Sequence, residues 1–389
     1  MTGGGSGGHI TPVLAVAKEV KRQYPHAKVV YIGQRGDMFG EVVAENAVID
    51  ETYTVHAGKF RRYHGQGWKQ FLDFHTLGLN IRDAFRAFIG IVQATLLLGR
   101  VKPDVVFCKG GFVGVPVGLA AAIRRIPYIT HDSDAIPGLA NRIISRWATK
   151  HAVALDAKLY PYPPEKTVSV GVPVSSDYGR VDERAKLAAR KALGIEQYKH
   201  VLLVTGGGLG AVRLNNAVIA HARQILEAVP STCIIHTTGQ LHEAEASASY
   251  TRALPKELRR QVIVRGFVTN LQEYSAAADV VVARGGATNF AELALQAKPC
   301  IFVPNPVLTG GHQLKNALVY EEKGAIICVQ ETDIEADSNV LAKEIIHLLQ
   351  DVRRQETLSK ALHAFARPEA AKDLAQIITG LAGSGSREV

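Results

Sequence analysis

The chain has 389 residues, of which 47% are hydrophobic and 21% are charged. This length accommodates two or three domains, and the composition is that of an ordinary globular protein. Whole-chain disorder, a collagen-like fibre and a disulfide-rich miniprotein are therefore excluded. The net charge of +9, from 45 Lys and Arg against 36 Asp and Glu, favours an anionic partner such as a phosphorylated substrate or an acidic membrane. We expect no nucleic-acid partner, because no basic low-complexity arm or aromatic–basic motif accompanies the charge.

The sequence predicts neither a transmembrane span nor a signal peptide. Its longest apolar stretches, 87–99 and 111–123, are shorter than the ~20 residues that a membrane-crossing helix needs. The chain opens on glycines rather than on a charged segment followed by an apolar one. Its four cysteines lie far apart and form no CxxC pair, which argues against a zinc cluster and is consistent with a reducing compartment.

Short β-branched runs alternate with amphipathic segments along most of the chain. The runs predict strands at 28–33, 104–108, 127–130, 151–155, 167–170, 200–205, 232–237, 261–264, 279–283, 299–303 and 325–329. The amphipathic segments predict helices at 11–24, 79–100, 211–229, 288–297 and 314–322. This alternation predicts an α/β fold, in which helices cover both faces of parallel sheets.

A turn-rich segment with four prolines, 160–176, separates two halves that have the same order of elements. Each half contains a glycine loop that leads into a helix, so we predict two Rossmann-like, doubly wound domains facing across a cleft. The expected bounds are 1–162 for the N-terminal domain and 163–364 for the C-terminal domain. We expect a final helix at about 365–382 to pack back on the first domain and the tail 383–389 to be disordered.

The first half has almost no sequence in front of its glycine loop. A Rossmann unit needs a strand at that position, but only Met1 and Thr2 precede Gly3. We therefore expect the first strand of the N-terminal domain to be missing and the natural start to lie upstream of Met1.

The first glycine loop, GGGSGG at 3–8, ends at His9 and leads into a helix. Glycines let backbone amides approach phosphate oxygens, and the helix N-terminus adds positive potential. The loop also fits a dinucleotide fingerprint, but Gln34 and Arg35 follow the next strand, where NAD binding would need an acidic residue. His9 is a candidate general base, since imidazole titrates near neutral pH. Its alternative role is to hydrogen-bond the loop.

Two further motifs follow strands of the first half. Gly110 and Gly111 form a second strand–glycine–helix turn, which could equally be a tight turn alone. The segment 131–134, with the sequence HDSD, offers Asp132 and Asp134 as groups that bind substrate hydroxyls or act as a base. Metal binding by these two carboxylates is the weaker alternative.

Three motifs follow strands of the second half. Residues 206–211 form another phosphate-binding loop, and Glu292, near the start of a helix, can accept hydrogen bonds from both hydroxyls of a ribose. A carboxylate that stabilises the helix dipole is the alternative for Glu292. His312 and Gln313 begin a further helix and either contact sugar hydroxyls or cap that helix. Carboxyl ends of parallel strands share one edge, so we expect these motifs to converge on one interdomain cleft.

The order of these motifs along the chain is specific. The blocks GGGSGGH, KPDVVFCKGGFVG, IPYITHDSDAIPGLANR, VGVPV, VLLVTGGGLGA, GFVTNLQEYSAAADVVVARGGATNFAE and PNPVLTGGHQLKNA resemble the MurG family of peptidoglycan N-acetylglucosaminyltransferases. The resemblance implies the GT-B architecture, with the acceptor in the first domain and the UDP-sugar in the second. It implies an inverting transfer, without metal or cofactor, from UDP-GlcNAc to the C4 hydroxyl of undecaprenyl-diphospho-muramyl-pentapeptide. It further implies a peripheral location on the cytoplasmic face of the inner membrane and contacts with other cell-wall enzymes.

The resemblance also assigns roles position by position. The acceptor diphosphate would be held by Gly5, Ser6, Gly7, Gly8, Gly110 and Gly111. The donor would contact Gly207, Gly208 and Gly210 near its phosphates, Val268 at the uracil, Glu292 at the ribose, and His312, Gln313 and Asn316 at the sugar hydroxyls. The chain departs from the family at 132–134, where Glu-Gln-Asn is usual, and at Ser175, where an arginine is common. A cationic phosphate contact is therefore lost or supplied by another residue.

A membrane-facing surface is also predicted in the first half. Apolar residues recur there at the spacing of one helical stripe, with Arg82 and Arg86 beside them. The stripe consists of Ile81, Phe85, Phe88 and Ile91 or Val92. The family places a hydrophobic, basic patch in this region against the anionic inner leaflet, and a peripheral surface needs both features. Packing of the stripe in the core is the alternative.

These motifs predict a direct displacement. A base, His9 or else Asp132 or Asp134, takes the proton of the acceptor hydroxyl, the oxygen attacks the anomeric carbon, and UDP leaves. Glycine-loop amides and a helix dipole stabilise the departing diphosphate. The alternatives are a UDP-sugar transferase acting on diacylglycerol, a UDP-GlcNAc 2-epimerase, and a nucleotide-binding protein without catalytic activity.

Overall fold

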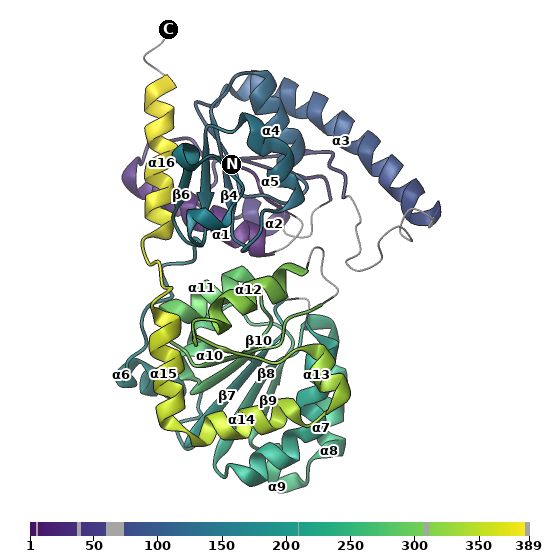
Figure 1. Cartoon of the computed structure of the whole chain (residues 1–389), viewed down its shortest axis with the longest axis vertical. Helices are drawn as coiled ribbons and strands as arrows, with labels where there is room; N and C mark the ends of the chain where they lie inside the picture. Colours follow the sequence, from purple (N-terminus) through teal and green to yellow (C-terminus); the bar gives the residue numbers. More distant parts are fainter. Residues whose placement is uncertain (5–6, 37–39, 60–73, 209, 307–310, 386–389) are drawn as a thin grey trace. The chain divides into compact units, whose positions relative to one another are not determined.

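The computed structural model describes residues 1–4, 7–36, 40–59, 74–208, 210–306 and 311–385. The chain forms two compact units (Figure 1). Unit 1 comprises Met1–Ser176, Val307–His312 and Arg367–Val389, and unit 2 comprises Asp177–Pro306 and Gln313–Ala366. The chain thus passes from one unit to the other after Ser176, downstream of the expected position 162.

Unit 1 is built on parallel strands. Its strands are β1 (Val30–Gln34), β2 (Glu51–Val55), β3 (Val106–Cys108), β4 (Tyr128–Asp132), β5 (Lys150–Val153) and β6 (Thr167–Ser169). Its helices are α1 (Gly7–Gln23), α2 (Gly40–Ala44), α3 (Phe74–Val101), α4 (Gly114–Ile123), α5 (Leu139–Ile144) and α16 (Ala370–Gly385), with 3-10 turns at Ser145–Trp147, Ala157–Leu159 and Pro164–Lys166. The strands pair in the orders β1-β2 and β3-β4-β5-β6. The strand β2 was not among the sequence predictions.

The first two residues of the chain join these two groups of strands. No named strand precedes α1 among the described residues, but Thr2 forms parallel bridges with both Ile32 of β1 and Cys108 of β3. The Thr2 amide donates to Phe107 O at 2.8 Å, and Thr2 O accepts from the Lys109 amide at 2.9 Å. The strand expected to be missing is therefore replaced by a two-residue stub, and the order becomes β2-β1-stub-β3-β4-β5-β6.

The last helix packs on unit 1. Leu374, Ala375 and Ile378 of α16 are buried in one apolar cluster with Val13 and Val16 of α1. This is the packing expected for the final helix. The helix continues to Gly385, so residues 383–385 are helical where disorder was expected, and 386–389 lie outside the described residues.

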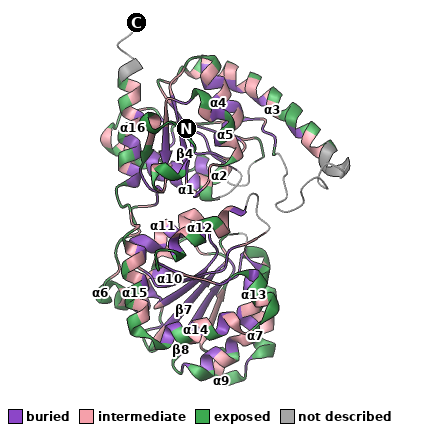
Figure 2. Cartoon of the chain, viewed as in Figure 1, coloured by how far each residue is buried: buried purple, intermediate pink, exposed green. Residues whose placement is uncertain are grey.

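Unit 2 is a six-stranded parallel sheet with helices on its faces. Its strands are β7 (His200–Thr205), β8 (Thr232–Thr237), β9 (Val262–Arg265), β10 (Val280–Ala283), β11 (Cys300–Phe302) and β12 (Ile327–Cys328). Its helices are α6 (Glu183–Ala192), α7 (Val212–Ala228), α8 (Glu243–Ala253), α9 (Lys256–Arg259), α10 (Leu271–Ala277), α11 (Ala287–Leu295), α12 (His312–Glu321), α13 (Glu331–Ala336), α14 (Val340–Gln350) and α15 (Val352–His363), with a 3-10 turn at Gln240–His242. The four inner strands β7, β8, β10 and β11 are buried almost throughout (Figure 2), whereas no residue of the edge strands β9 and β12 is fully buried.

The strand order of unit 2 locates its ligand-binding edge. The order β12-β11-β10-β7-β8-β9 is that of the doubly wound Rossmann fold, in which the winding reverses between β7 and β10. Such sheets bind ligands outside the carboxyl ends of the strands that flank the reversal. In unit 1 the same reversal falls between the Thr2 stub and β3. The loops that follow these four segments are therefore the expected ligand-binding loops.

Candidate functional site

The two glycine loops of unit 1 are in direct contact. Gly110 and Gly111 follow β3 with φ of 103° and 75°, values that suit glycine and strain other residues. A Cβ added at Gly111 would lie 2.7 Å from Gly4 O and 3.4 Å from Cδ2 of His9. The turn after β3 is thus packed against the loop after the stub, at the edge where a ligand is expected.

The helix after the first loop begins at Gly7. Gly8 is exposed in its first turn, which contains no acidic residue. The backbone amides of this turn are therefore available to an anion. The other two predicted loop residues, Gly5 and Ser6, lie outside the described residues.

His9 is held neutral in this environment. Its Nδ1 is enclosed and has no hydrogen-bond partner among the described residues. Burial, together with the charge of nearby Lys109, lowers the pKa of His9 from 6.5 to about 4. The imidazole is therefore uncharged at neutral pH, and its unprotonated nitrogen keeps a lone pair, but burial makes it a weaker base than an exposed histidine.

A buried cation stands beside His9. Lys109 directly follows β3 and is only 2% exposed. Its Nζ donates a hydrogen bond to Oγ of Ser133 at 2.8 Å. Burial lowers the pKa of Lys109 to about 8, and the charges of Asp134 and Asp132 act in the opposite direction. No role was predicted for Lys109 from the sequence.

Asp132 and Asp134 differ in their surroundings. Asp132 is buried, its Oδ2 accepts a hydrogen bond from the Tyr162 hydroxyl at 2.7 Å, and its Oδ1 accepts from the Gly138 amide at 3.2 Å. Burial raises the pKa of Asp132. These contacts fix the 133–138 turn, which favours a structural role for Asp132. Asp134 is only partly buried, and its charge reaches His9 and Lys109.

The glycine loop after β7 has the tight backbone that a phosphate-binding loop needs. Gly207 and Gly210 have φ of 79° and 77°. A Cβ added at Gly206 would lie 2.6 Å from the Ala211 amide nitrogen, and one at Gly210 would overlap Thr238 O. Gly207 and Gly208 are exposed. The loop therefore presents its backbone to solvent at the start of α7.

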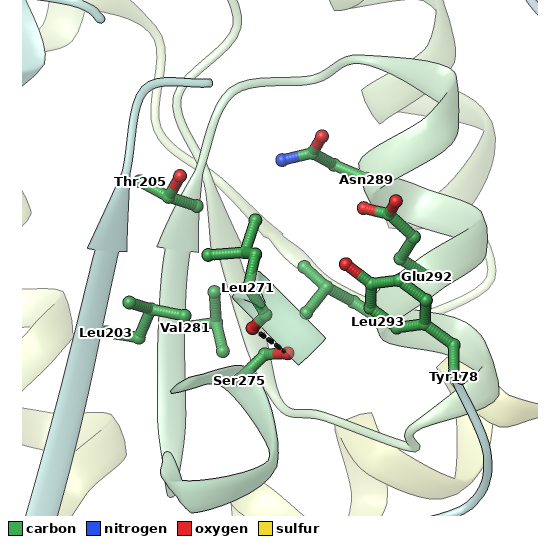
Figure 3. Close-up of a pocket in the computed structure, with 9 residues that line it drawn as sticks. All are labelled: Tyr178, Leu203, Thr205, Leu271, Ser275, Val281, Asn289, Glu292 and Leu293. Atoms are coloured by element: carbon green, nitrogen blue, oxygen red, sulfur yellow. Dashed lines mark hydrogen bonds between the residues drawn. The ribbon is translucent and has the colours of Figure 1, made fainter. Parts of the chain in front are cut away.

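Glu292 lines a small pocket between β7, β10, α10 and α11 (Figure 3). The pocket is lined by Tyr178, Leu203, Thr205, Leu271, Ser275, Val281, Asn289, Glu292 and Leu293. Burial raises the pKa of Glu292 from 4.5 to about 8, and a hydrogen bond with the Tyr178 side chain opposes this shift. The pocket lies beside β7 and β10, the two strands that flank the reversal, and it contains the carboxyl group to which the family resemblance assigned the ribose.

The remaining donor-side candidates belong to loops at the same edge. Gln313 Oε1 accepts from the Asn305 amide at 2.8 Å, and Asn316 Nδ2 donates to Gly285 O at 3.4 Å. The first bond holds the start of α12 to the loop after β11, and the second holds α12 to the loop after β10. Val268 is partly buried in the loop after β9, and His312 is partly buried at the first residue of α12.

An ionic network that sequence reasoning missed supports this edge. The buried Glu331, at the start of α13, pairs with Arg284 after β10 and with Arg213 in the first turn of α7, the latter at 2.7 Å. Arg284 also donates to Val303 O at 3.1 Å. No local pattern marks Glu331, because its partners lie far away in sequence.

The α3 helix exposes a long apolar stripe. Ile81, Phe85 and Phe88 are 64%, 66% and 64% exposed, so they do not pack in the core of unit 1. Val92 and Leu96 continue the exposed stripe, whereas Ile91 is partly buried. The segment Gly78–Val101 is also long and apolar enough, by length and composition, to cross a membrane, which the sequence analysis did not predict.

Within the described part of the chain, no cluster of three or more His, Cys, Asp or Glu side chains is placed to hold a metal ion. The acceptor-side candidates lie in unit 1 and most donor-side candidates in unit 2. Their convergence on a shared cleft stays a prediction.

Comparison with known proteins identifies the family. The model of the glycosyltransferase family 28 N-terminal domain matches residues 1–153, and that of the family 28 C-terminal domain matches 201–374. The UDP-N-acetylglucosamine–N-acetylmuramyl-(pentapeptide) pyrophosphoryl-undecaprenol N-acetylglucosamine transferase of Bacillus licheniformis is 32% identical over 382 residues, or 98% of each chain. Acinetobacter baumannii MurG matches with a TM-score of 0.70 at 22% identity over 98% of both chains. Anabaena HepE, solved with UDP, matches with a TM-score of 0.60 at 14% identity over 97% of this chain and 98% of its own. These two structures show the fold alone.

The two doubly wound units, their glycine loops and both domain models define a glycosyltransferase with the GT-B fold. The chain belongs to the family of UDP-N-acetylglucosamine–N-acetylmuramyl-(pentapeptide) pyrophosphoryl-undecaprenol N-acetylglucosamine transferases.

Proposed function

We propose that this chain transfers N-acetylglucosamine from UDP-GlcNAc to the C4 hydroxyl of undecaprenyl-diphospho-muramyl-pentapeptide, with inversion at the anomeric carbon. The observation that carries the proposal is the repeated arrangement at the two sheet reversals. Each reversal has a glycine loop leading into a helix, and each has a perturbed titratable group, His9 in unit 1 and Glu292 in unit 2. A glycine loop at a helix N-terminus binds phosphate, so two such loops suit two phosphate-bearing substrates.

His9 is the base that we favour. The neutral imidazole accepts the proton of the acceptor hydroxyl while its oxygen forms the new bond to the anomeric carbon. The bond from that carbon to the diphosphate breaks, and UDP leaves with the electron pair. His9 is preferred to Asp132 because both carboxylate oxygens of Asp132 already accept hydrogen bonds from within unit 1. Asp134 is retained as the second candidate.

The diphosphates are stabilised by backbone amides and one cation. The loop residues 206–211 and the start of α7 would receive the donor diphosphate, and Gly7, Gly8, Gly110 and Gly111 the acceptor diphosphate. Lys109, beside the latter, supplies the positive charge that the family commonly draws from an arginine at the position of Ser175. The ammonium group of Lys109 attracts the diphosphate electrostatically. Because Lys109 is already buried in the folded chain, binding requires little further desolvation of this group.

The exposed apolar stripe of α3 suggests that the protein acts at a membrane surface. We propose that Ile81, Phe85 and Phe88 insert into the acyl–headgroup boundary of the inner leaflet, and that Arg82 and Arg86 face anionic headgroups. Both arginines lie within ion-pair distance of the buried Asp83 while remaining half exposed. The peripheral position would bring unit 1 to a lipid-linked acceptor. Contacts with other cell-wall enzymes remain an expectation.

A panel of acceptors tests the function against its alternatives. The chain is incubated with UDP-GlcNAc and one of three additions: lipid-linked muramyl-pentapeptide, diacylglycerol, or none. We expect a disaccharide product only with the muramyl-pentapeptide. A glycolipid with diacylglycerol would identify the alternative transferase, and formation of UDP-ManNAc without acceptor would identify an epimerase. Absence of UDP binding would contradict the whole assignment.

The donor half of the proposal has its own test. Replacing Glu292 with Ala should weaken binding of UDP and of UDP-GlcNAc alike, because both carry the ribose. Unchanged affinity for both would contradict the ribose-binding role.

A further inference from the structure

The Tyr178 side chain turns toward the pocket that contains Glu292. Residues 176, 177, 179 and 180 are exposed, whereas Tyr178 is partly buried, so this side chain alone in the segment turns inward. It lines the pocket together with Glu292 and Asn289. Figure 3 shows its ring below Glu292, with the hydroxyl on the side of the carboxyl group. Tyr178 follows the point where the chain passes into unit 2.

Four polar side chains, those of Tyr178, Thr205, Ser275 and Asn289, line the pocket together with Glu292. Four of the lining side chains are apolar, and they are Leu203, Leu271, Val281 and Leu293. The Ser275 hydroxyl is already used, because it donates to Leu271 O at 2.9 Å. The Tyr178 hydroxyl lies on the side of the Glu292 carboxyl group (Figure 3), and its proximity favours the charged form of that group.

We propose that Tyr178 is a positioning residue for the donor ribose: its hydroxyl holds one oxygen of Glu292 so that the carboxylate presents its remaining acceptors to the two ribose hydroxyls. The proposal rests on the proposed function, which places the ribose at Glu292. It adds a residue to which neither the sequence motifs nor the family resemblance assigned a role.

Two consequences follow from the chemistry of a carboxylate with this partner. A hydrogen bond to the charged form favours that form and opposes the effect of burial. It also restricts the rotation of the carboxylate, so less freedom is lost when ribose binds. Without Tyr178, Glu292 should be protonated over a wider pH range and should bind ribose more weakly at neutral pH.

The variant Tyr178→Phe tests this directly. We expect the affinity for UDP and the KM for UDP-GlcNAc to worsen about tenfold at pH 7, because loss of the Tyr178 hydroxyl lowers the fraction of Glu292 that is ionised there, with kcat little changed. We expect the loss to shrink at pH 9.5, where Glu292 ionises in both proteins. The matched control is Tyr198→Phe, which removes a hydroxyl bonded to Arg260 O at 2.7 Å elsewhere in unit 2 and should leave UDP affinity unchanged.

A double-mutant cycle with Glu292→Gln separates a specific coupling from general damage. In the Glu292→Gln background, Tyr178→Phe should cost little further affinity. Equal losses in both backgrounds, a pH-independent loss, unchanged affinity, or tighter binding would each overturn the proposal; tighter binding would mean that Tyr178 competes with ribose. Failure of the proposed function is distinguishable, because then the unmodified chain would not bind UDP, or Glu292→Gln would bind it normally. Circular dichroism of each variant checks that it is folded.

Discussion

The ammonium group of Lys109 donates a hydrogen bond to the Ser133 hydroxyl at 2.8 Å, and the two residues directly follow the paired strands β3 and β4. Ser133 stands in the segment where the chain departs from its family. The bond therefore ties the glycine turn of unit 1 to the altered segment, and it holds a buried positive charge beside His9.

Replacing Lys109 with Met should impair use of the acceptor specifically. The variant keeps an unbranched side chain that is one atom shorter, but it removes the charge that we place at the acceptor diphosphate. We expect the KM for the lipid-linked acceptor to rise at least about tenfold, the size expected for one charge-assisted hydrogen bond, with UDP affinity unchanged. Steady-state kinetics with varied acceptor measures the first and calorimetry the second. A parallel loss of UDP affinity would place the effect of Lys109 elsewhere.

Replacing Gly111 with Ala should damage the acceptor loops of unit 1. The position has φ of 75°, and the new Cβ would approach Gly4 O to 2.7 Å. We expect a loss of about 1–3 kcal/mol in the free energy of unfolding and a lower transfer rate. Gly114→Ala is the matched control, since a Cβ there meets no atom within 4 Å and Ala favours the helix. Similar denaturation midpoints for the two variants would show that the Gly111 turn is not constrained.

The stability of unit 2 should fall in mild acid because of His236. This buried side chain contacts the Tyr250 hydroxyl at 2.8 Å and Asn215 Oδ1 at 3.1 Å, and burial lowers its pKa from 6.5 to about 3. Below pH 6.5 the imidazole of His236 is protonated in the unfolded chain, whereas in the folded chain it stays neutral down to about pH 3. The contribution of His236 to the free energy of unfolding is therefore complete above pH 6.5, and it falls by up to ~5 kcal/mol toward pH 3.

Denaturant unfolding at pH 7.5 and pH 4.5 measures this effect. His236→Asn should reduce the difference in the free energy of unfolding between the two pH values, even if the variant is less stable at both. His347→Asn, at an exposed position of α14, should preserve the difference. An unaltered pH dependence in His236→Asn would show that other groups cause the acid loss.

The exposed stripe of α3 should control binding to membranes. Phe85→Glu combined with Phe88→Glu should abolish most binding to vesicles that contain phosphatidylglycerol, because each phenyl group buried in lipid contributes ~2 kcal/mol. UDP affinity should not change. Leu241→Glu is the control, since Leu241 is 90% exposed on unit 2 and lies outside the stripe. Co-sedimentation that is equal for the two proteins would contradict a membrane role for α3.

The sequence predicted those parts of the fold that local patterns encode. The runs at 200–205 and 279–283 are apolar on both faces, and the glycines that follow mark the turns into α7 and α11. The strand β2 was missed because its residues alternate between exposed and partly buried positions at the edge of its sheet. The stub at Thr2 was missed because two residues are too short for any periodicity, and their pairing depends on β1 and β3.

In the candidate site, too, the residues that belong to local motifs were predicted from the sequence, and those that depend on distant partners were not. His9 and Glu292 follow glycine-rich turns, so their motifs were visible in the sequence. Tyr178, Lys109 and Glu331 were not recognised, because their importance arises from partners that the fold brings to them. Tyr178 meets a carboxyl group from α11, and Glu331 joins arginines from two other segments. Such long-range pairs have no local signature.

The most direct test is the rate of transfer by the unmodified chain and by His9→Ala, measured with UDP-GlcNAc, lipid-linked muramyl-pentapeptide and a metal chelator. We expect the unmodified chain to form the disaccharide product, and His9→Ala to lose at least about a hundredfold in kcat, the usual contribution of a general base, with UDP affinity preserved. Equal losses of kcat and UDP affinity in His9→Ala, or no product from the unmodified chain despite bound UDP, would contradict the account.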